Sequence, residues 1–235
     1  MSISVENLTK KYGAQTAINS ISFEAVTGVL GFLGPNGAGK STTMKILTGY
    51  IPQTSGKASV CGYDTLKDSL AIRKKIGYLA ENNPLYYDMY VKEFLSFVAG
   101  VHQLKNSKNR IKEVVELTGL AAEQHKKIGA LSKGYKQRVG LAQAIVHDPE
   151  VLILDEPTSG LDPNQLIEVR KLIKQLGETK TVILSTHIMQ EVEAVCNRVI
   201  IISKGEIVAN DTKENLLKVY AQESIEPVFV KLTNS

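Results

Sequence analysis

Short apolar runs alternate along this chain with stretches that suit helices. The apolar runs have the length of buried strands, and they cover 29–33, 151–155, 181–186, 198–203 and 206–209. Residues 1–30 and 57–63 alternate between apolar and polar positions, as strands with one solvated face do. Helical patterns are found at 40–50, 66–75, 163–176 and 188–197. Residues 91–148 contain no long strand-like run and are expected to be mostly helical. The pattern therefore predicts an α/β fold with a helical insertion.

A glycine-rich loop joins the first of these apolar runs to the first predicted helix. It reads Gly34-Pro35-Asn36-Gly37-Ala38-Gly39-Lys40-Ser41 and is followed by Thr42. Glycines let the backbone approach an anion closely, and successive N–H groups can then surround phosphate oxygens. Lys40 adds a positive charge for the outer phosphates, and the hydroxyl of Ser41 suits Mg²⁺. The alternative is a glycine-rich surface turn, and the strand before the loop and the helix after it argue against that.

Two carboxylates end the apolar run at 151–156. Because ligands of open α/β sheets lie beyond the carboxyl ends of the strands, we expect Asp155 and Glu156 at the same site as the loop. Asp155 is predicted to hold Mg²⁺, and Glu156 to polarise the water that attacks the γ-phosphate. The pair could instead merely cap the next turn, and the phosphate loop makes that interpretation the weaker one.

The segment Leu131-Ser132-Lys133-Gly134-Tyr135 lies between the loop and this second strand. With those two motifs on either side, it resembles the signature sequence, usually Leu-Ser-Gly-Gly-Gln, of ATP-binding-cassette (ABC) transporter ATPases. Lysine and tyrosine replace a glycine and the glutamine of that signature. The sequence at 159–162, Ser-Gly-Leu-Asp, resembles the D-loop of the same family. A simple helix cap would explain the serine but not the D-loop.

This resemblance, which covers roughly residues 1–215, implies the fold and activity of an ABC ATPase. The implied fold is a P-loop NTPase core with an N-terminal antiparallel β subdomain and an inserted α-helical subdomain. ATP and Mg²⁺ are the implied cofactors, and ATP hydrolysis is the implied reaction, coupled to transmembrane transport. Ser132 and Gly134 would serve ATP bound to a second subunit, so the resemblance implies a homodimer or a pair with a similar ATPase subunit.

Three residues outside these motifs also receive roles from the resemblance. Tyr12 would stack on adenine, with an ordinary turn tyrosine as the alternative. Glu81, where the family normally carries glutamine, would reach Mg²⁺ and the attacking water. His187, after the run at 181–186, would contact the γ-phosphate and orient Glu156, whereas a lone histidine after a strand is more often structural.

We expect one ATPase domain over residues 1–215, divided into two parts. The nucleotide core is predicted at about 1–85 and 149–215, and the helical subdomain at about 86–148. Residues 216–235 are expected to form a short C-terminal tail that begins with a helical stretch.

The segment 83–97 is rich in aromatic residues. The chain has nine tyrosines and five phenylalanines, and five of these fourteen residues lie in this segment. Tyr86, Tyr87 and Met89 fall in a predicted loop, and aromatic residues and methionine are enriched at interfaces. In the family, a cytoplasmic helix of a membrane subunit docks in this region. Ordinary packing under the loop is an equally good interpretation for any one of these residues.

Composition narrows the cellular context. No apolar run approaches the roughly 20 residues of a membrane span, and the first residues show no signal-peptide pattern. Cys61 and Cys196 have no metal-binding spacing and are expected to be free thiols. The net charge of +4 is mild, and no nucleic-acid motif is present. Together with these features, the resemblance implies a cytoplasmic protein, peripheral on the inner face of the cell membrane through separate polytopic permease subunits, and no nucleic-acid partner is expected.

The finer details most resemble ATPase subunits of bacterial exporters related to gliding-motility systems. Glu81, the Asn-Pro-Leu-Tyr-Tyr stretch at 83–87 and the Ser-Lys-Gly-Tyr stretch at 132–135 carry this narrower resemblance. It implies export, and it does not indicate the substrate. The alternative is a soluble ABC ATPase that acts on ribosomes or nucleic acid, although such proteins usually carry two cassettes or a long coiled coil.

Overall fold

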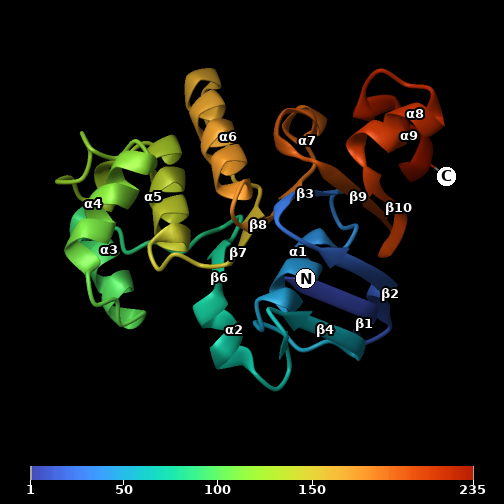
Figure 1. Ribbon diagram of the computed structural model, residues 1–235, viewed down its shortest axis with the longest axis horizontal. Coiled ribbons are helices and arrows are strands. Elements are labelled where there is room, and N and C mark those ends of the chain that lie inside the picture. Colours follow the sequence, from blue (N-terminus) through green and yellow to red (C-terminus); the bar gives the residue numbers. More distant parts are fainter. Residues whose placement is uncertain (1, 235) are drawn as a thin grey trace.

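The computed structural model describes residues 2–234, and two β-sheets form the centre of the fold (Figure 1). The smaller sheet is antiparallel, and its strands in spatial order are β2 (Gln15–Ala25), β1 (Ile3–Tyr12), β4 (Ser55–Val60) and β5 (Tyr63–Asp64). The larger sheet has the order β10 (Glu206–Thr212), β9 (Arg198–Ser203), β3 (Gly28–Leu33), β8 (Thr181–Thr186), β7 (Val151–Asp155) and β6 (Ile76–Leu79). All its neighbouring pairs are parallel except β10 with β9.

The parallel pairing brings the predicted motifs to one edge of the larger sheet. Strands β3 and β8 pair without a shift from Gly28↔Thr181 to Leu33↔Thr186. Strands β7 and β8 pair in the same direction, which sets Asp155 opposite Ser185. Since the carboxyl ends of parallel strands share an edge, the loop after β3 and the carboxylates at the end of β7 lie at the same edge, with only the end of β8 between them.

Helices occupy nearly all the positions at which the sequence predicts them. In chain order they are α1 (Lys40–Leu47), α2 (Ser69–Lys75), α3 (Val91–Val101), α4 (Ser107–Leu117), a short 3₁₀ turn (Ile128–Ala130), α5 (Lys133–Ile145), α6 (Pro163–Gly177), α7 (Met189–Val195), α8 (Lys213–Tyr220) and α9 (Ile225–Thr233). Helices α3, α4 and α5 gather on one side of the molecule, on the far side of β6 from the antiparallel sheet (Figure 1). Within residues 2–234, no helix combines the length and the apolar character that crossing a membrane requires.

The D-loop aspartate starts helix α6. Asp162 is its N-cap, and Oδ1 accepts a hydrogen bond of 2.9 Å from the N–H of Gln165. The side chain of Gln165 accepts a bond of 3.4 Å from the N–H of Asp162, and Pro163 occupies the first helical position. This capping box satisfies N–H groups that have no partner inside the helix.

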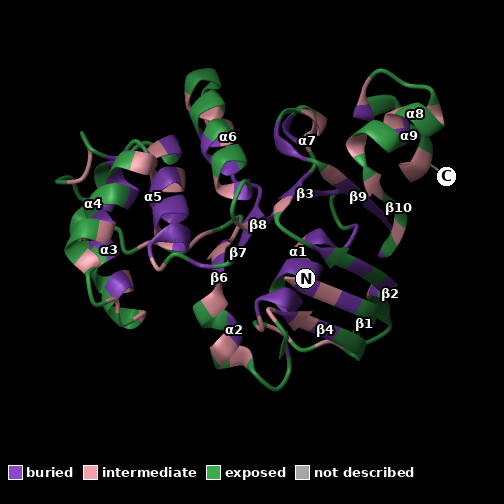
Figure 2. Ribbon diagram, viewed as in Figure 1, coloured by how far each residue is buried: buried purple, intermediate pink, exposed green. Residues whose placement is uncertain are grey.

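Both faces of the parallel sheet are buried, and each face belongs to its own apolar core (Figure 2). Along β3, Val29 and Leu33 join one core, while Leu30 and Phe32 join the other. This alternation follows from the opposite orientation of successive side chains in a strand. The first core also contains Phe94 of α3 and other residues of α4 and α5, so the helical insertion is packed onto the sheet.

Residues 216–234 are packed against the rest of the fold rather than extended from it. They contain most of α8 and all of α9, in which Leu216, Ile225 and Val228 are buried. These side chains belong to the same core as Val199 and Ile201 of β9. The apolar residues of so short a segment do not reveal which surface of the protein they pack against. The sequence alone therefore indicated only a C-terminal tail with a helical start.

Candidate functional site

The phosphate loop connects β3 to α1 and depends on glycine at position 39, just before the helix. Gly39 is the N-cap of α1, with φ of +108°. A Cβ atom at Gly39 would lie 2.7 Å from the carbonyl oxygen of Ala17, a backbone atom that cannot easily move. Both the backbone conformation and the close approach of the β1–β2 hairpin therefore exclude a side chain here.

Lys40 is the basic group of this loop, and it is only 6% exposed. Its Nζ donates hydrogen bonds to the carbonyl oxygens of Gly34 (2.7 Å) and Pro35 (3.2 Å). Burial lowers the pKa of Lys40, while the negative charges of Glu156, Asp155 and Glu81 oppose that shift. The three carboxylates predicted for catalysis and metal binding therefore act on the loop lysine.

Asp155 and Glu156 are both buried where β7 ends. The hydroxyl of Ser185 donates a 2.7 Å hydrogen bond to Oδ1 of Asp155. Glu156 has φ of +52°, a conformation that is uncommon for a residue with a side chain, and its N–H donates to the carbonyl of Ser185 (2.9 Å). Strand β8 thus fixes both residues, and such backbone strain is often found at functional sites.

Two residues at the end of β8 contact the carboxylate of Glu156. Nδ1 of His187 lies 2.8 Å from Oε1, and the hydroxyl of Thr186 donates to Oε2 over 3.4 Å. The His187 side chain is 52% exposed and the Glu156 side chain only 8%. The imidazole therefore lies between the buried carboxylate and solvent, on the side from which a substrate would approach.

Most of the predicted nucleotide-binding residues line one cavity of about 520 Å³. Its lining includes the predicted residues Tyr12, Asn36, Gly37, Gly39, Lys40, Ser41, Thr42, Glu81, Glu156 and His187. The sequence prediction missed Gln15, Thr16 and Ala17, which also line it. These three residues begin β2, separated from Tyr12 by two residues of the sequence, and this closeness to Tyr12 was the available signal.

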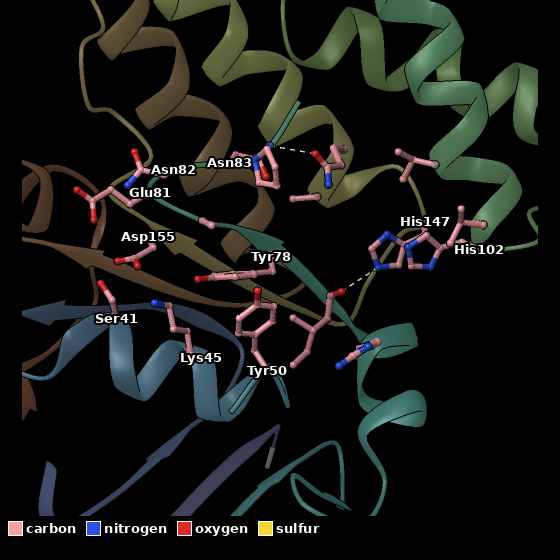
Figure 3. A pocket seen from close by; sticks show the side chains of 18 residues that line it. Ser41, Lys45, Tyr50, Tyr78, Glu81, Asn82, Asn83, His102, His147 and Asp155 are labelled. Carbon is pink, nitrogen blue, oxygen red and sulfur yellow. Dashed lines mark hydrogen bonds between the residues drawn. The ribbon is translucent and has the colours of Figure 1, made fainter. Parts of the chain in front are cut away.

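A second cavity, of about 660 Å³, adjoins the first where both are lined by Ser41 and Glu81. Figure 3 shows Ser41, Glu81 and Asp155 together at one end of it, with Tyr50 and Tyr78 beside them. Burial raises the pKa of Tyr78 to about 12, and Asp155 adds to the shift. The stacked rings of His102 and His147 close the other end (Figure 3), with centroids 3.8 Å apart.

The signature segment opens helix α5 and does not line the cavity that holds the phosphate loop. Ser132 is the N-cap, and its hydroxyl accepts a 3.4 Å hydrogen bond from the N–H of Tyr135. A Cβ atom at Gly134 would lie 2.0 Å from Oε1 of Gln165, so a larger residue there would require the Gln165 side chain of α6 to move. Gln137, which the sequence prediction missed, donates from Nε2 to the carbonyl of Glu156 over 3.3 Å.

Comparison with known proteins agrees with this geometry. The profile of the ABC transporter family matches residues 18–159, more than half of the chain. The chain is 40% identical over 218 residues to the linearmycin resistance ATP-binding protein LnrL of Bacillus subtilis (strain 168), which covers 91% of this chain and 70% of that protein.

Two solved structures are similar along most of their length. The ATP-binding subunit of an ABC transporter superposes with a TM-score of 0.91 at 26% identity, over 99% of each chain. The dimeric, post-hydrolysis state of the ATP-binding cassette MJ0796, bound to ADP and Pi, superposes with a TM-score of 0.82 at 25% identity, over 89% of this chain and 98% of that one.

These similarities confirm the predicted P-loop ABC fold, the binding of ATP and its hydrolysis. They favour a transporter subunit over the alternative of a soluble ABC ATPase that acts on ribosomes or nucleic acid. The chain therefore belongs to the ABC transporter family, in which it is a subunit that binds and hydrolyses ATP.

Proposed function

We propose that two copies of this chain, or one copy and a similar ATPase subunit, close head to tail around two ATP molecules. The observation that carries this proposal is the separation of the two halves of the site. The phosphate loop and Glu156 share one cavity, whereas Ser132 and Gly134 do not line it. Because helix N-termini favour anions, the start of α5 can bind the phosphates of an ATP held by another molecule. The dimeric state of the similar cassette MJ0796 supports this arrangement.

Hydrolysis in this proposal depends on Glu156. Its carboxylate orients the attacking water and accepts a proton from it, while His187 holds Oε1 and contacts the γ-phosphate. Gly34, Pro35 and Ala38 shape the backbone of the loop, and Lys40 turns from the carbonyls of Gly34 and Pro35 toward the outer phosphates. Tyr12, which is 49% exposed, offers one ring face to adenine.

The donors for Mg²⁺ in this proposal are Ser41, Asp155 and Glu81. A hydroxyl and two carboxylates are the hard oxygen ligands that Mg²⁺ prefers, and they lie at one end of the second cavity (Figure 3). When bound, the ion would neutralise charge on the β- and γ-phosphate oxygens. Ser185 already holds Oδ1 of Asp155, which orients the carboxylate for this role.

We assign the nucleotide core to about 1–85 and 149–215, and the helical subdomain to about 86–148. The transport path belongs, in this proposal, to separate polytopic permease subunits, and the chain is peripheral on the cytoplasmic face of the membrane. The loop before α3 is the docking candidate, since Tyr86 and Tyr87 are 58% and 56% exposed. We propose export as the direction, in line with the resistance protein LnrL.

The decisive experiment uses the Glu156→Gln variant and its oligomeric state. The amide keeps the size of the side chain but cannot accept the proton, so we expect the rate of hydrolysis to fall by at least about 100-fold and the ATP-bound dimer to persist. Light scattering with ATP and Mg²⁺ should report a mass twice that of the nucleotide-free protein. Glu214→Gln, on an exposed position of α8, is the matched control and should keep wild-type turnover.

A Glu156→Gln protein that stays monomeric with ATP and Mg²⁺ would contradict the proposed dimer. The same variant, tagged and purified from gently solubilised native membranes, tests the membrane partner. Mass spectrometry should identify a polytopic protein in the sample. Recovery from the soluble fraction with ribosomes or nucleic acid would contradict the transport proposal and leave the ATPase activity intact.

A further inference from the structure

A side chain from the signature helix holds the backbone of Glu156. Gln137 lies in α5, and its Nε2 donates a 3.3 Å hydrogen bond to the carbonyl oxygen of Glu156, 19 residues further along the chain. Since a carbonyl oxygen can only accept, the amide of Gln137 must present its nitrogen at this point. The contact joins two segments to which the proposed function gives separate roles. Helix α5 serves the ATP of a partner, whereas Glu156 serves the ATP of its own chain.

The backbone of Glu156 has a conformation that depends on its surroundings. Its φ is +52°, which a residue with a side chain keeps only where neighbouring contacts hold it. On one side, the N–H of Glu156 donates to the carbonyl of Ser185 (2.9 Å), so β8 fixes the start of the residue. On the other side follows Pro157, whose nitrogen carries no hydrogen. The carbonyl of Glu156 is therefore the group through which the next peptide unit can be held.

Two donors reach this carbonyl, and they differ in what they are attached to. The N–H of Ser159 donates over 3.2 Å and closes a turn of which Glu156 is itself a part. Nε2 of Gln137 donates from α5, a helix whose Val139 and Leu141 are buried in the apolar core. A carbonyl oxygen has two lone pairs, so it can accept both bonds. The first bond moves with the turn, whereas the second fixes the turn to the rest of the protein.

We propose that Gln137 is a positioning residue for ATP hydrolysis: through the carbonyl of Glu156 it sets the direction of that residue's carboxylate. Rotation of this peptide unit would turn the Cα–Cβ bond of Glu156 and move Oε1 away from His187. Ser132 caps the same helix about one and a half turns before Gln137. A helix that binds the partner's ATP at its start thus also holds the catalytic residue of its own chain. The proposal rests on the roles of Glu156 and the signature segment proposed above.

Two substitutions of Gln137 separate the hydrogen bond from mere packing. Gln137→Glu keeps the shape of the side chain but has no donor when ionised, and Gln137→Met keeps the length without a donor or an added charge. We expect both variants to lose about three- to tenfold in kcat, the usual effect of one hydrogen bond. KM for ATP should change less than about twofold, because the phosphate loop is untouched. Gln175→Met, at an exposed position of α6, is the matched control and should keep wild-type turnover.

The Glu156→Gln background shows where Gln137 acts. If Gln137 works through the carboxylate of Glu156, its removal should cost little once that carboxylate is gone. We expect the residual single-turnover hydrolysis of the double variant Glu156→Gln with Gln137→Met to match that of Glu156→Gln within about twofold. The ATP-bound dimer should persist in both proteins, since the start of α5 is unchanged. Light scattering with ATP and Mg²⁺ measures the dimer.

Three outcomes would overturn the proposal. Wild-type kcat in Gln137→Met would show that the contact does not act on hydrolysis. Full activity in Gln137→Glu beside a slow Gln137→Met would show that the side chain acts through its shape and not as a donor. A further loss of residual hydrolysis in the double variant, or loss of its dimer, would show that Gln137 acts on the partner's site. A Glu156→Gln protein that is active, or that stays monomeric, would instead contradict the proposed function itself.

Discussion

The phosphate loop and the signature segment both place a glycine at the start of a helix, but they meet different neighbours. At Gly39, an added Cβ would strike the backbone carbonyl of Ala17 at 2.7 Å, in a loop with φ of +108°. At Gly134, an added Cβ would strike the side-chain amide of Gln165 at 2.0 Å, and no positive φ is involved. A backbone obstacle is rigid and a side chain can rotate. The loop is therefore built as a rigid cradle within one chain, whereas the signature segment is held by a contact that can adjust.

The two parts of the site also differ in how far their polar side chains are buried and hydrogen-bonded within one chain. Lys40, Asp155 and Glu156 are buried, and each makes hydrogen bonds within the chain. Ser132 and Lys133 are exposed, and Ser132 caps α5 through a long 3.4 Å bond. In the proposed dimer, one half of the site would thus be organised before the partner binds, and the other half would be accessible to it. The comparison predicts that substitutions in the two segments affect different steps.

The largest effect is expected from substituting the two glycines. Gly39→Ala combines backbone strain with a fixed clash, so ATP affinity should fall by on the order of 100-fold. Gly134→Ala should leave ATP affinity of the monomer nearly unchanged and slow turnover. Equilibrium binding of a fluorescent ATP analogue and steady-state hydrolysis measure the two quantities.

The companion variant for this test is Gly134→Ala with Gln165→Ala. Shortening the side chain of Gln165 removes the obstacle, and turnover should recover in part. Loss of nucleotide binding by the Gly134→Ala monomer would show that Gly134, like Gly39, is needed for ATP binding within one chain. That result would contradict the proposed difference between the two segments.

Ser132→Ala should have the next largest effect. The lost hydroxyl would be a donor to phosphate in the second subunit, and a hydrogen bond to a charged group of this kind is worth about 10- to 100-fold in rate. We expect kcat to fall by that factor while the Kd of the monomer for ATP stays within error. Ser107→Ala, at the start of α4, is a control that should not change either quantity. Loss of affinity in the Ser132→Ala monomer would place this serine in its own subunit's site.

The contact between the end of α5 and the start of β6 should make the stability of the fold depend on pH, through His147. Its ring stacks on His102, and Nε2 contacts the carbonyl of Ile76 at 3.0 Å. Burial, followed by the positive charge that His102 can carry, lowers the pKa of His147 from 6.5 to about 4. Below pH 6.5, His147 therefore binds a proton in the unfolded chain but stays neutral in the folded protein. The free energy of unfolding falls as the pH falls from about 6.5 to about 4.

His147→Gln removes this loss because an amide does not titrate in that range. After allowance for the partial exposure of the ring, we expect wild type to lose about 1–2 kcal/mol more than His147→Gln between pH 7 and pH 5. Urea unfolding at the two pH values measures the difference. His125→Gln, at an exposed position, should behave as wild type. Equal pH dependence in wild type and His147→Gln would rule out this source of acid sensitivity.

Glu81→Gln should have the smallest effect. Glu81 is exposed and lines both cavities, so its charge is largely solvated. Most ATPase activity should remain, and the Mg²⁺ concentration for half-maximal activity should change by about two- to fivefold. A Mg²⁺ titration identical to wild type would indicate that Glu81 does not contact the metal.

The sequence predicted the local parts of this site well and the long-range contacts poorly. The loop 34–41, the strand ending at Asp155 and the helix starting after Ser132 are encoded by consecutive residues, and all three are found at the predicted positions. In contrast, Gln137 contacts the carbonyl of Glu156, and Gly134 faces Gln165, across separations that no local pattern specifies. The tail beyond 215 belongs with the second group, since its burial depends on β9.

By itself, the sequence determined which residues can cradle phosphate and which strand ends carry carboxylates, because backbone freedom at glycine and strand periodicity act over a few neighbouring residues. Only the tertiary structure decided that Thr186 and His187 hold the two oxygens of Glu156. The register between β7 and β8 sets Asp155 opposite Ser185, and the next residues of the two segments, Glu156 and Thr186, make the hydrogen bond between their side chains. Pairing between strands is a property of the assembled sheet, and it is settled when both faces of that sheet are buried.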